Sequence, residues 1–282
     1  MLTLGLGLIA AFCWGLHDIC VRWVSQRTPL MAALLTVLIA GSLFQGIYMA
    51  AEGSFAPIPG PALGLAFLSG VAFTVASVGL YHAFAVGPVR LVSPIIAAYP
   101  VLSVSWAALS GSPVTLLQWL AIGAIITGVS TVAVLSHPEE TATATSRTPT
   151  ILWALLAACG FAVTFALGQA AARIAPDLPV ILMTRLAAIT ALVVVMAATR
   201  IPFVPTRQAL PILATMGLLD AIALVCVLSA GGLPNAEYAA VTSSVFGMVT
   251  ILLAWAFLNE HMARSQWAGV LLAFSGIAYL AA

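Results

Sequence analysis

The chain presents one pattern of five long apolar runs twice, which restricts its fold more than any single motif. Residues 2–135 and 152–281 read as two copies, and the fifth run of each contains Gln-Trp followed nine residues later by Gly. The ten runs fall near residues 2–24, 30–51, 61–86, 89–109, 114–135, 150–172, 178–199, 208–231, 237–258 and 265–281. Five is an odd number. A copy that crosses a membrane five times therefore starts the next copy from the opposite face, and the two copies must be inverted.

Composition makes lipid the expected surroundings of these runs. The 282 residues are 63% hydrophobic and only 6% charged, whereas a soluble protein carries about 25% charged residues. Each run is close to the roughly 20 residues that a helix needs to cross the hydrocarbon layer. The runs lack the period-2 alternation typical of membrane strands. The prediction is an all-α membrane protein whose ten transmembrane helices form two inverted five-helix repeats around a central cavity.

The expected organisation is a first repeat over 1–135, a linker over 136–149 and a second repeat over 150–282. The linker sequence combines Glu139-Glu140 with a Thr/Ala/Ser stretch, a composition typical of flexible segments. Inverted repeats around a cavity at the membrane midplane are the usual architecture of secondary transporters. The duplicated pattern therefore favours transport by a multi-pass membrane protein.

Other classes of function find little support in the residues. The chain has no HExxH, GxSxG, CxxC or P-loop pattern, so neither an enzyme nor an ATP-driven pump is expected. A hydrolase pair of Ser243-Ser244 with His82 would lack a Gly-rich oxyanion turn. The four cysteines lie in apolar runs at no metal-like spacing and are expected to be small buried side chains, so neither a metal nor a cofactor is predicted. The net charge of +1 argues against nucleic acid as a partner.

All nine basic residues are arginines, and they predict an orientation. Counted over alternate loops, seven fall on the face opposite the N-terminus, Arg173 falls on the other, and Arg185 lies inside a helix. The positive-inside rule would place the arginine-rich face in the cytoplasm and both termini outside.

Three ionisable residues inside apolar runs each need a physical reason, because such groups cost a few kcal/mol at the bilayer centre. Asp18 could pair with Arg22, four residues later on the same helical face, or it could be a proton- or cation-binding carboxylate in the cavity. Asp220 has no basic neighbour within one turn. It could pair with Arg185 of the preceding run or couple transport directly. Arg185 could instead hold a substrate carboxylate in bidentate fashion.

Helix breakers recur at matching places in the fourth run of each copy. At a shift of 147 residues, Tyr99-Pro100 falls opposite Phe246-Gly247. Paired breakers in two halves are the best sequence pointer to a transport site, and Pro100 would bend its helix. Ser243 and Ser244 adjoin the second breaker and could either line the cavity or bond neighbouring helices.

Aromatic and polar side chains in other runs are further candidates for substrate binding. Trp14 and Phe161 occupy similar places in the first run of each copy, where they could contact apolar groups or organic cations. Packing against a neighbouring helix is the equal alternative. The remaining candidates are His17, Tyr81, His82 and Gln169.

These residues together resemble the drug/metabolite transporter superfamily, specifically ten-helix proteins with two EamA-type domains. The resemblance covers the whole chain and rests on these features: Ala-x-x-Trp-Gly at Ala11 to Gly15, Arg185, Pro100, the segment Ala256-Phe257-Leu258-Asn259-Glu260 that is close to the family's L-G-E, and the twofold Gln-Trp-x8-Gly. Two departures occur in the first copy. Ser110-Gly111-Ser112 stands where the family often has Gly-Glu, and Leu38 stands opposite Arg185.

The resemblance implies an exporter of amino acids or related small metabolites that works by alternating access, with the aromatic amino acid exporters as the most similar type. It implies that helices 1, 3, 4, 6, 8 and 9 surround the cavity, and that both termini are cytoplasmic, opposite to the arginine count. A proton-coupled exporter of organic cations, using Asp18 or Asp220, is the alternative. We expect a monomer in the inner cell membrane, in contact with lipid, whose partner is a small amphipathic molecule.

Overall fold

The computed structural model describes residues 2–102, 105, 115–135, 147–233, 237–260 and 262–281, and this part of the chain is helical throughout apart from its connecting segments. The first copy contains α1 (Leu2–Val24), α2 (Leu30–Glu52), α3 (Gly60–Val86), α4 (Val89–Ala97) and α6 (Leu116–Leu135). The second contains α7 (Arg147–Ala172), α8 (Asp177–Thr199), η1 (Arg207–Ala209), α9 (Leu210–Ser229), η2 (Ala230–Gly232), α10 (Glu237–Ser243), α11 (Phe246–Phe257) and α12 (Arg264–Ala281). Within the described residues, seven helical spans are long and apolar enough to cross a membrane, and shorter apolar helices accompany them.

The helices begin and end close to the expected positions, with one correction at the linker. Helix α7 begins at Arg147, so residues 147–149 belong to a helix and not to the linker. Pro149 does not prevent this, because the first turn of a helix needs no backbone donor. The remaining linker residues, 136–146, lie outside the described residues. So do 103–104 and 106–114, which include the end of the expected fourth run and Ser110-Gly111-Ser112.

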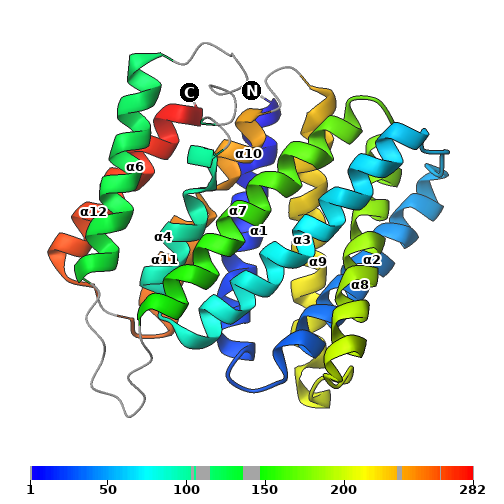
Figure 1. Ribbon diagram of the computed structural model, residues 1–282, viewed down its shortest axis with the longest axis horizontal. Helices are drawn as coiled ribbons and strands as arrows, with labels where there is room; N and C mark the ends of the chain where they lie inside the picture. Colours follow the sequence, from blue (N-terminus) through cyan, green and yellow to red (C-terminus); the bar gives the residue numbers. More distant parts are fainter. Residues whose placement is uncertain are drawn as a thin grey trace.

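The long helices pack together as a bundle, with some lying in front of others in the view of Figure 1. Helices α6 and α12 pack on each other at one edge, and α2 and α8 lie at the other. Helices α1, α3, α7 and α9 fill the middle, where α3 packs on α7 and α8 while α9 packs on α1 and α2.

The outer surface of the bundle is apolar. Ile47 of α2, Val194 of α8 and Leu116 of α6 are 70%, 61% and 74% exposed. Soluble monomers rarely expose continuous apolar surfaces of this kind, whereas lipid tails cover them at no cost. Cys159, expected to be buried, also faces outward. The protein is therefore a multi-pass membrane protein.

Two glycines make the same contact in the two copies. A Cβ on Gly70 of α3 would clash with the Thr184 carbonyl oxygen of α8, and a Cβ on Gly217 of α9 would lie 2.6 Å from the Val37 carbonyl oxygen of α2. Gly217 and Thr184 each come 147 residues after their counterparts, Gly70 and Val37. Both pairs of helices approach this closely because the residue at the contact has no side chain.

Helices α6 and α12, at one edge of the bundle, also make one contact twice, here between residues that are 148 positions apart in the two copies. Gly128 lies against Gly269 and Ala273, whereas Gly276 lies against Ala121 and Ile125. Later residues of α6 thus meet earlier residues of α12 and the reverse, so the two helices are antiparallel.

The fourth span of each copy is interrupted at matching positions. Helix α4 ends at Ala97, Ala98 forms a turn and helical structure resumes over 99–102. Helix α10 ends at Ser243, and α11 starts at Phe246 after a turn at Ser244-Val245. Pro100 and Gly247 each stand two residues after Ala98 and Val245. Pro94, which the sequence reasoning did not single out, lies inside α4 and removes one further backbone donor.

Candidate functional site

A cavity lies in the middle of the bundle and is lined by both copies. The space free of atoms is about 480 Å³ and is partly open to the outside of the bundle. The side chains leave it narrow. The lining residues come from six helices and the segment after α4: Trp14, His17, Asp18, Leu34, Val37, Leu38, Phe73, Ser77, Leu80, Tyr81, Tyr99, Phe161, Phe165, Asp220 and Phe246.

Aromatic rings form a continuous part of the wall. Trp14 of α1 lies with its ring centroid 5.5 Å from that of Phe165 and 6.4 Å from that of Phe246. The ring of Phe165 also lies 5.9 Å from Phe161 and 5.2 Å from Tyr99. These spacings are those of favourable aromatic pairs, so the rings support one another as a surface for an apolar or aromatic group.

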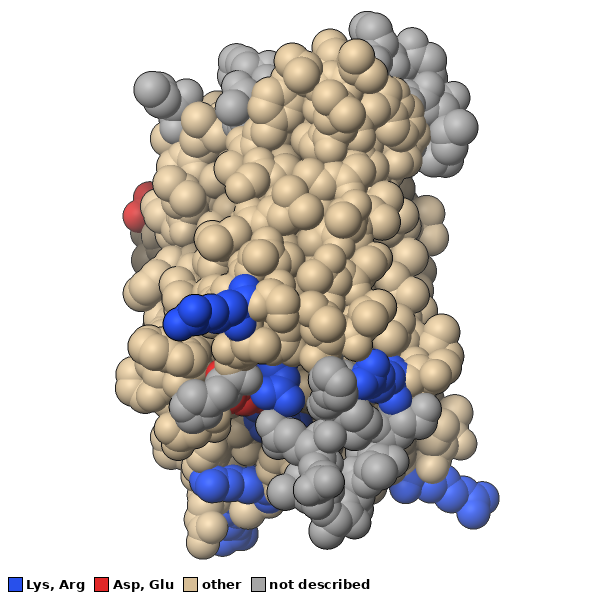
Figure 2. Space-filling view, turned by 90° about the vertical axis from the view of Figure 1, so that its left-hand side faces the viewer, with Lys and Arg blue, Asp and Glu red and all other residues tan. Residues whose placement is uncertain are grey.

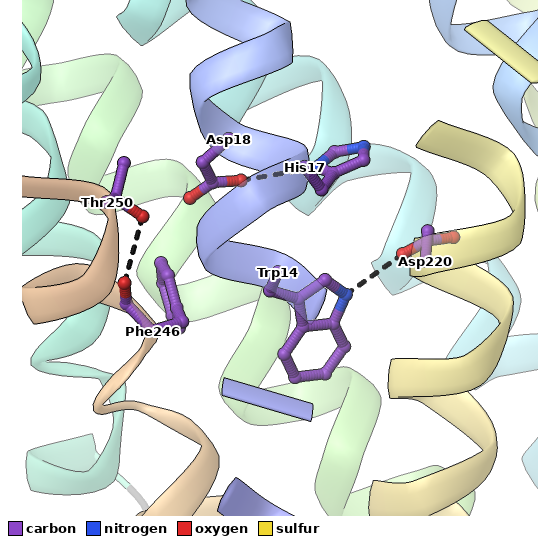
Figure 3. Close-up of polar contacts among 6 residues, drawn as sticks. All are labelled: Trp14, His17, Asp18, Asp220, Phe246 and Thr250. Atoms are coloured by element: carbon purple, nitrogen blue, oxygen red, sulfur yellow. Dashed lines mark hydrogen bonds and ion pairs between the residues drawn. The ribbon is translucent and has the colours of Figure 1, made fainter. Parts of the chain in front are cut away.

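The first carboxylate of the cavity, Asp220, is fully engaged by its neighbours. Its Oδ1 accepts a hydrogen bond of 3.1 Å from the indole Nε1 of Trp14 (Figure 3). Its Oδ2 accepts one of 2.6 Å from Nη2 of Arg185, with which it forms an ion pair. The structure thus shows the pair between α8 and α9 and adds Trp14 as a second donor.

Arg185 lies behind the cavity wall and does not line it. Its side chain is fully buried, and a Cβ added to Gly41 of α2 would lie 2.6 Å from Nη1. Its Nε and Nη1 atoms have no hydrogen-bond partner. In this arrangement the guanidinium neutralises Asp220 and does not face the space in which a substrate carboxylate could bind.

The second carboxylate, Asp18, is only half engaged. Its Oδ1 lies 3.2 Å from Nδ1 of His17, whereas its Oδ2 is buried and has no hydrogen-bond partner. In Figure 3 the free oxygen lies on the side of α1 that faces α11, where Thr250 and Phe246 are drawn. Arg22 does not pair with Asp18, because its Nη1 donates to the carbonyl oxygen of Phe84 at 2.6 Å.

The two tyrosines of the cavity differ in the same way. The hydroxyl of Tyr99 donates to the carbonyl oxygen of Ala240 and lies 2.7 Å from Oγ of Ser243, which ties the segment after α4 to α10. The hydroxyl of Tyr81 is buried without a hydrogen-bond partner, and its ring lies 6.2 Å from that of His17.

Several predicted site residues lie outside the cavity lining. His82 stacks on Trp153 with ring centroids 4.6 Å apart, and Gln169 donates to the carbonyl oxygen of Val227. Ser243 lies next to the Tyr99 hydroxyl, while Ser244, in the turn after α10, donates to the carbonyl oxygen of Val241 in that helix. Each of these side chains makes a local or interhelical contact, and for Ser243 and Ser244 this is the interhelical or local bonding given above as the alternative to cavity lining.

The paired breakers also differ in what they do. Gly247 lies in the first turn of α11, where a Cβ would come within 2.8 Å of the Ala97 side chain and 3.0 Å of the Ser93 carbonyl oxygen. Gly247 therefore permits close packing of α11 on α4, while Pro100 adjoins the turn at Ala98.

Comparison with known protein families identifies the class of protein to which the chain belongs. A model of the EamA-like transporter family matches residues 1–134 and again residues 148–282. The chain belongs to this family. As an EamA-like transporter it is a membrane transport protein, and the two matches cover the two copies seen in the sequence.

The fold of this EamA-like transporter also occurs in a solved structure. A crystal structure of another protein matches it with a TM-score of 0.73 at 15% identity, covering 97% of this chain and 94% of the other. At that identity the likeness concerns the fold alone. No curated protein matches the sequence.

Sequence reasoning missed part of the lining of the EamA-like transporter. Helix α2, which the family resemblance did not include, contributes Leu34, Val37 and Leu38. Helical spacing could have found others: Phe165 follows Phe161 by one turn, and Ser77 precedes Tyr81 by one turn. The α2 residues carry no such signal, since they are aliphatic like most of the chain.

The end of the bundle that carries the arginines has a polar link of its own. On the face shown in Figure 2, Arg side chains gather in the lower half, away from the end at which Figure 1 marks both termini. There the Glu260 carboxylate accepts hydrogen bonds of 3.1 Å from the backbone N–H groups of Val89 and Arg90, at the start of α4. Asn259 turns the chain with φ of 54°, a conformation that Asn adopts more readily than most residues other than Gly.

Proposed function

We propose that this EamA-like transporter is a secondary transporter that exports amino acids or related small metabolites by alternating access. The observation that carries the proposal is the central cavity, which combines an aromatic wall with two carboxylates and draws its lining from both copies. A small amphipathic solute has the mixed apolar and polar character that such a lining suits, and opening of the narrow cavity would admit it. Export as the direction follows the resemblance to exporters.

The exchange of contacts between the copies supports an inverted repeat. Gly70 with Thr184 and Gly217 with Val37 are one contact made twice. The antiparallel pair of α6 and α12 is what a two-fold axis across the helices, in the membrane plane, would produce. Two such repeats can pack against each other in two equivalent conformations, one open to each side of the membrane, and this is the basis of alternating access.

Contacts at both ends of α4 suggest which parts would move. One is the bond of Tyr99 to Ala240, and the other is the bond of Glu260 to the start of α4. Both join α4 and its following segment to the span of α10 and α11, with the narrow cavity between them. We infer that the cavity opens to one side or the other by rocking of α3 and α4 against α9 to α11, which would break one link at a time.

The test is counterflow in liposomes. Purified protein is reconstituted with an excess of unlabelled amino acid inside, and uptake of labelled amino acids and organic cations is measured from outside. We expect uptake of at least one amino acid, abolished by Ser77→Phe, which would fill the cavity. Ser275→Phe is the matched control, because Ser275 is exposed on α12. Failure of wild-type protein to move any amino acid or organic cation contradicts the proposal.

A proton-coupled exporter of organic cations is the second candidate, and Asp18 is the observation that favours it. The described residues of the cavity lining include no arginine, so a substrate carboxylate would find only His17 as a titratable cation. If this function holds, an imposed pH gradient drives ethidium movement in wild-type liposomes but not in Asp18→Asn liposomes. Equal pH dependence in both would exclude it.

A further inference from the structure

The cavity wall contains two polar atoms that the fold leaves without partners. Asp18 and Tyr81 are 1% and 2% exposed, yet Oδ2 of the aspartate and Oη of the tyrosine make no hydrogen bond. A buried polar group without a partner loses the hydrogen bonds that it makes in water, and in lipid no solvent can compensate for them. Both residues line the same cavity, and both flank His17.

The charges around Asp18 are also out of balance. Arg185 neutralises Asp220, and Trp14 takes the other oxygen of that carboxylate. Asp18 has only His17 beside it, and a neutral imidazole would leave one buried negative charge uncompensated. Such a charge in a low-dielectric interior requires a proton or a cationic partner.

The surroundings of the free oxygen suit one kind of cation. The rings of Trp14, Phe165 and Phe246 lie in the same cavity and can hold an apolar or aromatic body. They can also attract its positive charge. An acceptor such as Oδ2 is satisfied only by a donor, so a primary ammonium with N–H groups fits and a quaternary ammonium does not.

We propose that Asp18 Oδ2 and Tyr81 Oη form a subsite for a protonated primary amine that carries an apolar or aromatic body. The inference rests on the proposed role of the cavity as the substrate site, and it would apply to the amino group of an amino acid or to a simple amine. His17 holds the Asp18 carboxylate from its other oxygen. Asp220 is not the amine site, because both of its oxygens already accept hydrogen bonds.

The experiment measures binding of labelled phenethylamine to the purified full-length protein in detergent, with unlabelled competitors. Phenethyl alcohol has the same body with a neutral hydroxyl, and the N-trimethyl derivative of phenethylamine keeps the charge without N–H. Phenylalanine and hydrocinnamate form a second pair that differs in the amino group. The variants are Asp18→Asn and Tyr81→Phe, with Asp177→Asn as the control, because Asp177 lies at the start of α8, outside the cavity lining.

Phenethylamine and phenylalanine should compete, while the alcohol, the N-trimethyl derivative and hydrocinnamate should each be at least about tenfold weaker, as expected for loss of a charge-assisted hydrogen bond. Asp18→Asn should weaken phenethylamine binding by at least about tenfold, Tyr81→Phe by about two- to fivefold, and Asp177→Asn should bind as wild type. Gel filtration and thermal unfolding confirm that each variant is folded.

Three results would overturn the amine subsite: no binding of phenethylamine or phenylalanine to wild type, equal competition by phenethyl alcohol, or unchanged binding in Asp18→Asn. Counterflow separates this failure from failure of the proposed function. If wild type and Asp18→Asn move amino acids equally well, the cavity transports but the amine is held elsewhere. If amines bind through Asp18 and nothing is transported, the subsite stands and the transport proposal falls.

Discussion

Two carboxylates in one cavity show how differently a membrane protein can treat the same group. Asp220 accepts one bond at each oxygen, from Trp14 and Arg185. Asp18 lies one turn beyond Trp14 on α1, and one of its oxygens has no partner. Because lipid offers no hydrogen bonds, a satisfied group stabilises the fold by itself. A buried polar group without a hydrogen-bond partner lowers the stability of the fold, and a ligand that supplies the missing hydrogen bond removes this cost.

The largest effect on stability is expected from removing the charge of Asp220, the carboxylate whose two oxygens both accept hydrogen bonds. Asp220→Asn leaves the Arg185 guanidinium buried without a counter-charge, so we expect the free energy of unfolding to fall by about 3–5 kcal/mol. Asparagine keeps an acceptor for Trp14, which confines the change to the ion pair. Denaturant titration of the purified protein in micelles measures it.

The double variant Asp220→Asn with Arg185→Met is the control for that loss. It removes the uncompensated charge and should recover most of the stability, as replacement of buried pairs by apolar groups does elsewhere. If the single variant were as stable as wild type, the pair would not hold α8 to α9.

The second donor to Asp220 should matter less than the first. Trp14→Phe keeps a ring against Phe165 but removes the indole N–H, so we expect a loss of about 1–2 kcal/mol, the size of a strong interhelical hydrogen bond. The same titration measures it, with Trp255→Phe as control, since that indole is 54% exposed. An equal loss in both variants would show that ring size, not the hydrogen bond, is the cause.

Removing the hydroxyl of Tyr99, which is hydrogen-bonded, should also lower the free energy of unfolding, but by less. Tyr99→Phe loses the hydroxyl bonds to Ala240 and Ser243, and we expect about 0.6 kcal/mol, the average for such bonds in membranes. Tyr81→Phe, which removes a hydroxyl without a partner, should be neutral or slightly stabilising. Thermal unfolding of the two variants side by side tests the contrast, and a loss of the same size in both contradicts it.

The sequence predicted an all-helical membrane protein because length and apolarity determine spans in lipid. The odd number of runs predicted inversion, and the proposed inverted repeat would account for the contact of Gly70 repeated at Gly217. Ser244 and Gln169 could not be assigned in this way. A polar side chain in an apolar helix has the same spacing whether it faces a cavity, its own carbonyl or a neighbouring helix.

The contrast between Asp18 and Asp220 was beyond the sequence for a related reason. Both are acidic residues inside apolar runs, and Asp18 even has a basic residue four positions later. In the structure Arg22 turns to the Phe84 carbonyl, and the distant Arg185 reaches Asp220. The packing of α9 against both α1 and α8 decides which carboxylate is satisfied.

The smallest effect on stability is expected at Asp18, the carboxylate with one unpartnered oxygen. Whether its replacement stabilises or destabilises the protein shows how far Asp18 differs from Asp220. Asp18→Asn removes a buried negative charge that has only His17 beside it, so we expect the free energy of unfolding to stay within about 0.5 kcal/mol of wild type or to rise. The titration used for Asp220→Asn measures both variants under one condition. A loss comparable to that of Asp220→Asn would mean that Asp18 also holds the helices together. A stable Asp18→Asn variant that no longer binds phenethylamine would show that Asp220 stabilises the cavity whereas Asp18 binds the ligand.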